Sequence, residues 1–152
     1  MTPEERAAEV TEIIASAATL PLKDAAYSLW RSRYRLDTLE DRPTADEVRI
    51  NRALSPAALS AKIRYEHDHA QDGPAFVHMK RAFPDASDDT IKQAVIAAVK
   101  FEDACEKYFL QDNKVDYWER CVRAVGCARK ENPGYLESTY QAACNNVAYD
   151  WK

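Results

Sequence analysis

Glycine is scarce in this chain, and its scarcity limits the folds that the chain can adopt. Only 3 of the 152 residues are glycine: Gly73, Gly126 and Gly134. That is about 2%, against roughly 7% in an average protein. Phosphate-binding loops and the positive-φ turns of all-β and doubly wound folds depend on glycine. The composition therefore argues against a nucleotide-binding α/β enzyme.

Helix-start signals recur along the chain at short intervals. Residues 2–5 (TPEE) and 44–47 (TADE) have the spacing of a capping box, in which two side chains satisfy free backbone N–H groups. Further cap signals lie at 55–56, 87–89 and 113–116. Between these signals the apolar residues recur at helical spacing, and no segment alternates with period two long enough for a strand. The sequence therefore predicts an all-α fold.

We expect a compact bundle of about seven or eight helices, of which the last three form long antiparallel hairpins. A single domain over residues 1–152 is favoured, with a division into 1–71 and 72–152 at the Asp72-Gly73-Pro74 turn as the alternative. The expected helices cover residues 3–18, 22–40, 45–53, 56–70, 74–83, 88–112, 114–131 and 135–150.

Charge and hydropathy restrict the compartments and partners of the chain. The formal net charge of −4 argues against a general binder of polyanions. No apolar run reaches the roughly 18 residues that a membrane span needs, so we expect no membrane partner. The first residues are acidic where a secretory signal would be basic. We therefore expect a cytoplasmic protein.

The four cysteines, Cys105, Cys121, Cys127 and Cys144, lack the close pairs of a structural zinc site. Buried free thiols are the favoured interpretation, because cysteine is commonly a small buried residue. As the alternative, helical hairpins would place Cys105 level with Cys121 and Cys127 level with Cys144, allowing two disulfides in an oxidising compartment.

Glu66 and His69 lie one helical turn apart, as in the repeated unit of ferritin-like di-iron proteins. Such proteins need this unit twice, and a second copy is absent from the sequence. No Gly-x-Ser-x-Gly elbow or other nucleophile motif is present either. We therefore expect no enzymatic activity and no cofactor, and we keep a metal-dependent helical enzyme at Glu66 and His69 as a secondary alternative.

Residues 31–64 are the most informative segment for function. They hold seven arginines and one lysine against five acids, within an acidic chain. Three aromatic residues cluster on one flank of the expected 22–40 helix, with two arginines beside them. Aromatic and arginine side chains together are typical of protein interfaces. We predict that the following residues bind a partner: Tyr27, Trp30, Arg31, Tyr34, Arg35, Arg42, Arg49 and Arg52.

The favoured function is a non-enzymatic protein-interaction or regulatory module, because arginine beside aromatic residues is expected at such interfaces. The alternative is a nucleic-acid-binding regulator that uses the arginine-rich segment 31–64. The acidic segment 85–119 could pack against that basic segment or serve self-association. The oligomeric state itself is not predicted.

Two single residues carry local predictions. Arg33 falls within the core stripe of its helix, between Leu29 and Leu36, so we expect an internal ion pair or an interface there. Gly126 lies inside the expected 114–131 helix, where glycine costs about 0.5–1 kcal/mol relative to alanine. We therefore expect a neighbouring helix to approach closely at Gly126.

Overall fold

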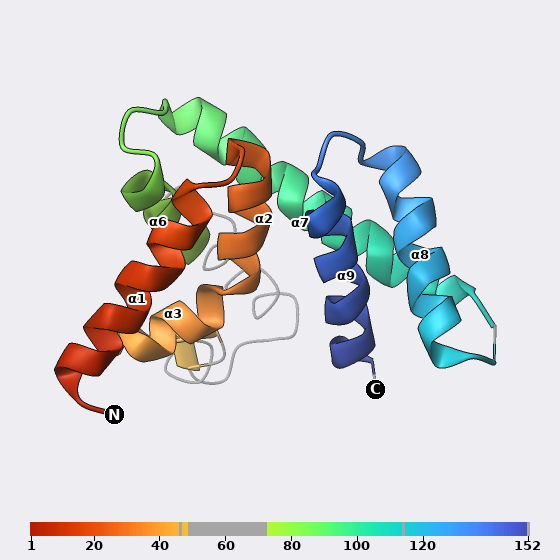
Figure 1. The fold of residues 1–152 in the computed structure, drawn as a ribbon, viewed down its shortest axis with the longest axis horizontal. Helices are drawn as coiled ribbons and strands as arrows, with labels where there is room; N and C mark the ends of the chain where they lie inside the picture. The colour runs from red at the N-terminus through yellow and green to blue at the C-terminus, as the bar shows by residue number, and fades with distance from the viewer. Residues whose placement is uncertain (46, 49–72, 114, 152) are drawn as a thin grey trace. The chain divides into compact units, whose positions relative to one another are not determined.

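The computed structural model describes residues 1–45, 47–48, 73–113 and 115–151, and these residues form helices and no strand (Figure 1). The all-α prediction is confirmed. The expected helix 56–70 and most of 45–53 lie outside the described residues. The seven helices described are α1 (Pro3–Ala18), α2 (Leu22–Arg31), α3 (Arg33–Leu39), α6 (Pro74–Ala82), α7 (Asp88–Gln111), α8 (Tyr117–Glu131) and α9 (Glu137–Asp150).

The chain divides into two compact units, Met1–Val95 and Ile96–Lys152, which we call unit 1 and unit 2. The boundary lies within α7, which contributes its first turns to unit 1 and the remainder to unit 2. It does not coincide with the Asp72-Gly73-Pro74 turn. The single domain over 1–152 stays a prediction, and each unit is described by itself below.

Both predicted capping boxes form in unit 1. At the start of α1 the Glu5 N–H donates to the Thr2 hydroxyl (3.1 Å), and the Thr2 N–H donates to the Glu5 carboxylate (2.7 Å). The second box has the same pattern, with the Glu47 N–H on the Thr44 hydroxyl (3.3 Å) and the Thr44 N–H on the Glu47 carboxylate (2.9 Å). These side chains satisfy backbone groups that the first helical turn leaves unpaired.

The core of unit 1 is built by α2, α3 and α6, and α1 packs against all three. Of the residues of α1, Ala17 is the buried one, while Val10, Ile13 and Ile14 are half-buried. Helix α1 therefore lies on the surface of the unit. The innermost side chains are those of Ala25, Ala26, Leu29, Leu36, Ala75 and Met79.

The single helix predicted over 22–40 is wrong, because the chain bends at Ser32 between α2 and α3. Ser32 has φ −90° and ψ 1°, outside the helical range. The buried Arg33 side chain donates a hydrogen bond to the Trp30 carbonyl in the last turn of α2 (2.7 Å). The apolar spacing continues across the bend, so periodicity alone does not reveal it.

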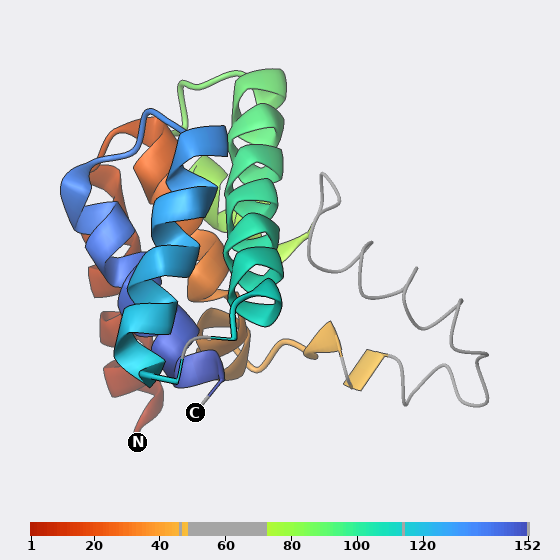
Figure 2. The ribbon, with the colours of Figure 1, turned by 90° about the vertical axis from the view of Figure 1, so that its right-hand side faces the viewer.

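Helices α8 and α9 of unit 2 run antiparallel, in agreement with the predicted hairpin (Figure 2). The Tyr117 hydroxyl donates to the Ala148 carbonyl (2.5 Å) near one end of the pair. Arg129 donates to the Glu137 carboxylate (2.7 Å) near the other end. These two contacts fix the register of α8 against α9.

An aromatic cluster fills the core of unit 2. The fully buried Phe101 ring lies 5.1 Å from the Tyr135 ring and 5.5 Å from the Tyr140 ring, measured between centroids. The Tyr140 hydroxyl donates to the Asn132 carbonyl (2.6 Å) and accepts a hydrogen bond from the Tyr135 N–H (3.3 Å). Tyr140 therefore joins the aromatic core to the loop between α8 and α9.

All four cysteines are free thiols, and three of them are buried while Cys127 is exposed. Burial raises the pKa of Cys121 and of Cys144, and the charge of Cys121 raises the pKa of Cys144 further. The contacts of Tyr117 with Ala148 and of Arg129 with Glu137 set Cys121, and not Cys127, level with Cys144. The predicted match of Cys127 with Cys144 is wrong.

The packing prediction for Gly126 is also wrong. The residue is exposed, and a β-carbon built on it would meet no atom within 4 Å. Within the part of the chain that the structure describes, no helix approaches Gly126. The glycine therefore weakens α8 without a packing reason inside the described chain.

Candidate functional site

The residues predicted to bind a partner do not form one exposed surface. Tyr27 and Trp30 are only 4% and 6% exposed, so both belong to the core of unit 1. Tyr34 and Arg35 are exposed on α3, while Arg31 and Arg42 are half-buried. Two further arginines of the prediction, Arg49 and Arg52, lie outside the described residues. The aromatic flank of α2 thus stabilises the fold, and α3 carries the accessible part of the prediction.

Arg33 is buried, as the sequence predicts. Its guanidinium lies 4.0 Å from the centre of the Trp30 ring and 4.4 Å from that of the Tyr34 ring. Arginine stacks readily on aromatic faces, because the flat guanidinium is weakly hydrated. Asp37 lies one turn further along α3 and is also buried. The ion pair expected for Arg33 stays a prediction.

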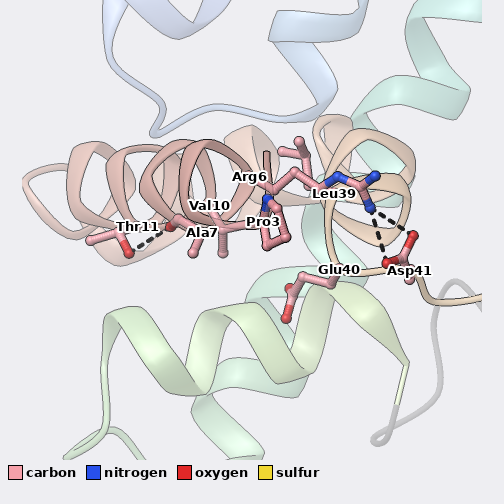
Figure 3. A pocket seen from close by; sticks show the side chains of 8 residues that line it. All are labelled: Pro3, Arg6, Ala7, Val10, Thr11, Leu39, Glu40 and Asp41. Atoms are coloured by element: carbon pink, nitrogen blue, oxygen red, sulfur yellow. Dashed lines mark hydrogen bonds and ion pairs between the residues drawn. The ribbon is translucent and has the colours of Figure 1, made fainter. Parts of the chain in front are cut away.

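Unit 1 has an open pocket of about 570 Å³ between α1 and the end of α3 (Figure 3). Both its apolar and its polar lining come partly from α1 and partly from the end of α3. None of the six predicted binding residues that the structure describes lines this pocket. It is lined by Pro3, Arg6, Ala7, Val10, Thr11, Leu39, Glu40 and Asp41.

The end of α3 places two consecutive acids at the pocket. Asp41 has φ 54°, in the left-handed region that usually carries glycine. The Arg42 N–H donates to the Asp37 carbonyl (2.8 Å) and the Asp41 N–H to the Thr38 carbonyl (3.3 Å), which is the bonding of a Schellman motif. Aspartate tolerates this conformation better than most residues. The motif therefore turns the chain sharply and leaves the Asp41 carboxylate at the surface.

Each of these acids is held by an arginine from a different helix. One Arg6 nitrogen from α1 contacts both Asp41 oxygens, at 2.9 and 3.0 Å (Figure 3). One Arg81 nitrogen from α6 contacts both Glu40 oxygens, at 2.9 and 3.0 Å. The pocket therefore has carboxylates of α3 and a guanidinium of α1 on its wall.

A third ion pair, between Arg35 and Glu9, also joins α3 to α1. Arg35 donates from two nitrogens to the two oxygens of Glu9, at 2.8 and 2.9 Å. This two-point geometry orients both groups. Because the Arg35 side chain is half exposed, the pair contributes little to stability, on the order of 0–1 kcal/mol.

His78 of α6 is fully buried next to Glu40. Its Nδ1 atom lies 3.7 Å from a Glu40 oxygen and 3.5 Å from an Arg81 nitrogen. Burial lowers the pKa of His78 to about 4, Glu40 opposes this shift, and the charges of Arg81 and Arg42 reinforce it. The imidazole is therefore neutral at pH 7, and it couples the end of α3 to the core.

The polar groups that line the pocket are of three kinds. Among the described residues, its lining holds carboxylates, one guanidinium and one threonine hydroxyl, but no thiol or imidazole. Among the described residues, no group of histidine, cysteine and acid side chains has the arrangement of a metal site. Glu66 and His69, the secondary metal candidates, lie outside those residues. The pocket can accept an apolar side chain and pair with charges of either sign.

Sequence reasoning missed the pocket because its partners are far apart in the chain. Arg6 and Asp41 are separated by 35 residues, and Glu40 and Arg81 by 41. No local spacing rule connects such pairs. The available signal was the acidic pair Glu40-Asp41 shortly before the helix-start signal at 44–47, which indicates a turn that carries two carboxylates.

None of the described helices combines the length and the apolar character that crossing a membrane requires. No protein-family model, curated protein or solved structure matches this chain.

Proposed function

We propose that this chain is a non-enzymatic protein-interaction module, which binds a segment of another protein in the pocket between α1 and α3. The observation that carries the proposal is the pocket itself, whose lining combines apolar side chains with charges of both signs. Such a combination suits a peptide, because a peptide offers apolar side chains next to polar backbone and charged groups.

Each part of the pocket would have its own role in this binding. Val10 and Leu39, from α1 and α3, would contact an apolar side chain of the partner. Arg6 and Asp41 already face each other at 2.9 Å, and each could pair with an opposite charge of the partner instead. Glu40 is held by Arg81 and would supply a fixed carboxylate.

The same contacts favour a protein over a nucleic acid as the partner. Arg35 is paired with Glu9, and Arg42 lies 3.8 Å from the buried Asp37. Glu9 and Asp37 offset the positive charge of these two arginines, which would otherwise attract the phosphates of a nucleic acid. The wall of the pocket carries Glu40 and Asp41 as well, which would repel a nucleic-acid backbone.

The test begins by selecting peptides from a random display library against the full chain. A selected peptide is titrated into isotope-labelled protein, and amide shifts are followed by NMR. We expect the shifts to gather on α1 and α3. Val10→Asp should weaken binding by about tenfold or more, because it places a charge in the apolar part of the pocket.

Ala8→Asp is the matched control, since Ala8 is exposed on the same helix and does not line the pocket. It should leave the affinity within about twofold. Circular dichroism melting of both variants separates lost binding from lost folding. Shifts that map outside α1 and α3, or equal losses in the two variants, would contradict the proposal. Salt-sensitive RNA binding with no peptide binding would support the nucleic-acid alternative.

A further inference from the structure

Helix α8 exposes a stripe of large apolar side chains. Val115, just before the helix, is 97% exposed, Trp118 is 48% exposed and Val122 is 42% exposed. Within the helix, Trp118 and Val122 are four residues apart and therefore lie on one side of α8. The sequence alone would assign these side chains to the core, yet the buried side of α8 consists of other residues: Cys121, Ala124, Val125 and Ala128.

Gly126 continues the same stripe, four residues beyond Val122 and eight beyond Trp118. The space that its missing side chain would occupy is open, since no atom lies within 4 Å of a β-carbon built there. A glycine inside a helix lowers the stability of that helix. On one side of Val122 the surface of α8 thus carries the bulky Trp118 indole, and on the other side it has open space at Gly126.

We propose that α8 is a self-association surface, on which a second copy of this chain packs its own α8 in antiparallel orientation with the two-fold axis at Val122. Trp118 and Gly126 are each four residues from Val122, in opposite directions. An antiparallel two-fold pair centred on Val122 therefore sets the Trp118 indole of each copy over Gly126 of the other. Val122 meets its own counterpart on the axis, as an isologous interface requires.

The charges along α8 favour this orientation. The helix begins with acidic groups, Asp116 at the cap and Glu119 in the first turn. Its last turn holds Arg129, which also pairs with Glu137, and Lys130, before the final Glu131. In an antiparallel pair the acidic end of one helix lies beside the basic end of the other. A parallel pair would bring like charges together. The second copy is thus the occupant that the charges of α8 match.

The size of the surface predicts a weak dimer. The 15 residues of α8 rise about 22 Å, so one helix face buries less area than a stable dimer of standard size requires. Association should therefore depend on concentration. It uses a helix of unit 2 and does not involve the pocket proposed above for partner binding.

Sedimentation velocity across a hundredfold range of concentration tests the proposal on the full chain. The wild type should shift from monomer to dimer as the concentration rises. The Gly126→Leu variant should remain monomeric, because its leucine occupies the space that the Trp118 indole of the second copy would fill. Leucine is a better helix former than glycine, so the substitution does not weaken α8 itself. Cys127→Leu is the matched control, since it adds an apolar group at the next, exposed position off the stripe. This control should dimerise like the wild type.

Cross-linking tests the geometry. Val122→Cys in a Cys127→Ser background should form an intermolecular disulfide under mild oxidation, because the two-fold axis places residue 122 beside its counterpart. The wild type, whose exposed thiol is Cys127, should not cross-link. A wild type that stays monomeric at every concentration would overturn the proposal. So would a dimer that Gly126→Leu leaves intact, or one that both leucine variants weaken equally.

Discussion

The two units of the chain are stabilised by different kinds of contact. Unit 1 encloses charged and titratable groups, among them Asp24, Arg33, Asp37 and His78. Unit 2 encloses an aromatic cluster around Phe101. The buried, neutral His78 makes the stability of unit 1 depend on pH in the acid range, whereas aromatic packing does not titrate. The comparison therefore predicts that acid weakens unit 1 first, while loss of ring volume weakens unit 2.

The largest effect is expected from removing the central ring of unit 2. Phe101→Ala leaves a cavity against Tyr135 and Tyr140, so the free energy of unfolding should fall by about 3–5 kcal/mol. Urea denaturation followed by circular dichroism measures the loss. Leu110→Ala, at an exposed position on the same helix, should cost less than about 1 kcal/mol. Equal losses in the two variants would show that Phe101 is not central to the core.

The second-largest effect is the dependence of the chain's stability on pH, which arises from His78. Its pKa is about 4 in the folded chain, against about 6.5 in the unfolded chain. The unfolded state therefore binds the extra proton between these values, and stability is lost as the pH falls from about 6.5 to about 4. The loss attributable to this group is about 3 kcal/mol at most.

His78→Gln isolates that contribution, because glutamine is polar and carries no titrating proton in this range. The difference in unfolding free energy between wild type and variant should shrink as the pH is lowered from 7 to 4. Urea titrations at several pH values measure it. A difference that stays constant with pH would mean that His78 is not buried as a neutral group.

A smaller effect is expected from one hydroxyl of unit 2. Tyr140→Phe keeps the ring but removes the hydrogen bonds to the Asn132 carbonyl and from the Tyr135 N–H. Both groups are near or within the buried core, so the loss should be about 1–3 kcal/mol. Amide hydrogen exchange should show the largest increase in the loop over 132–136. An increase spread evenly over both units would argue against this local role.

The smallest effect has the opposite sign. Gly126→Ala should stabilise the chain by about 0.5–1 kcal/mol, because alanine favours the helix and its β-carbon meets no atom within 4 Å. Thermal unfolding at low protein concentration, where the monomer predominates, measures the gain. A loss of stability would mean that a part of the same chain covers Gly126.

The sequence predicted the helical fold because helix starts are local. The capping boxes at Thr2 and Thr44 involve residues three apart, and both form as expected. The bend at Ser32 was missed because the apolar spacing continues from α2 into α3 across it. Apolar spacing also does not reveal that Trp118 and Val122 are exposed, since periodicity identifies an apolar face without showing what covers it.

The candidate site was less predictable than the fold. The sequence indicated the region around α2 and α3, but it could not distinguish the buried Trp30 from the exposed Tyr34 on adjoining helical turns. The pocket depends on the end of α3 meeting α1, which brings Arg6 to Asp41 across 35 residues. Such contacts follow from tertiary packing, and a single sequence does not record them.

The most direct measurement is amide hydrogen exchange of the full chain with and without a peptide selected by the display experiment. If the pocket between α1 and α3 is the binding site, the peptide should slow exchange in these two helices and leave α8 and α9 of unit 2 unchanged. Slower exchange in α8 and α9 alone, or no change in α1 and α3, would contradict the proposed function.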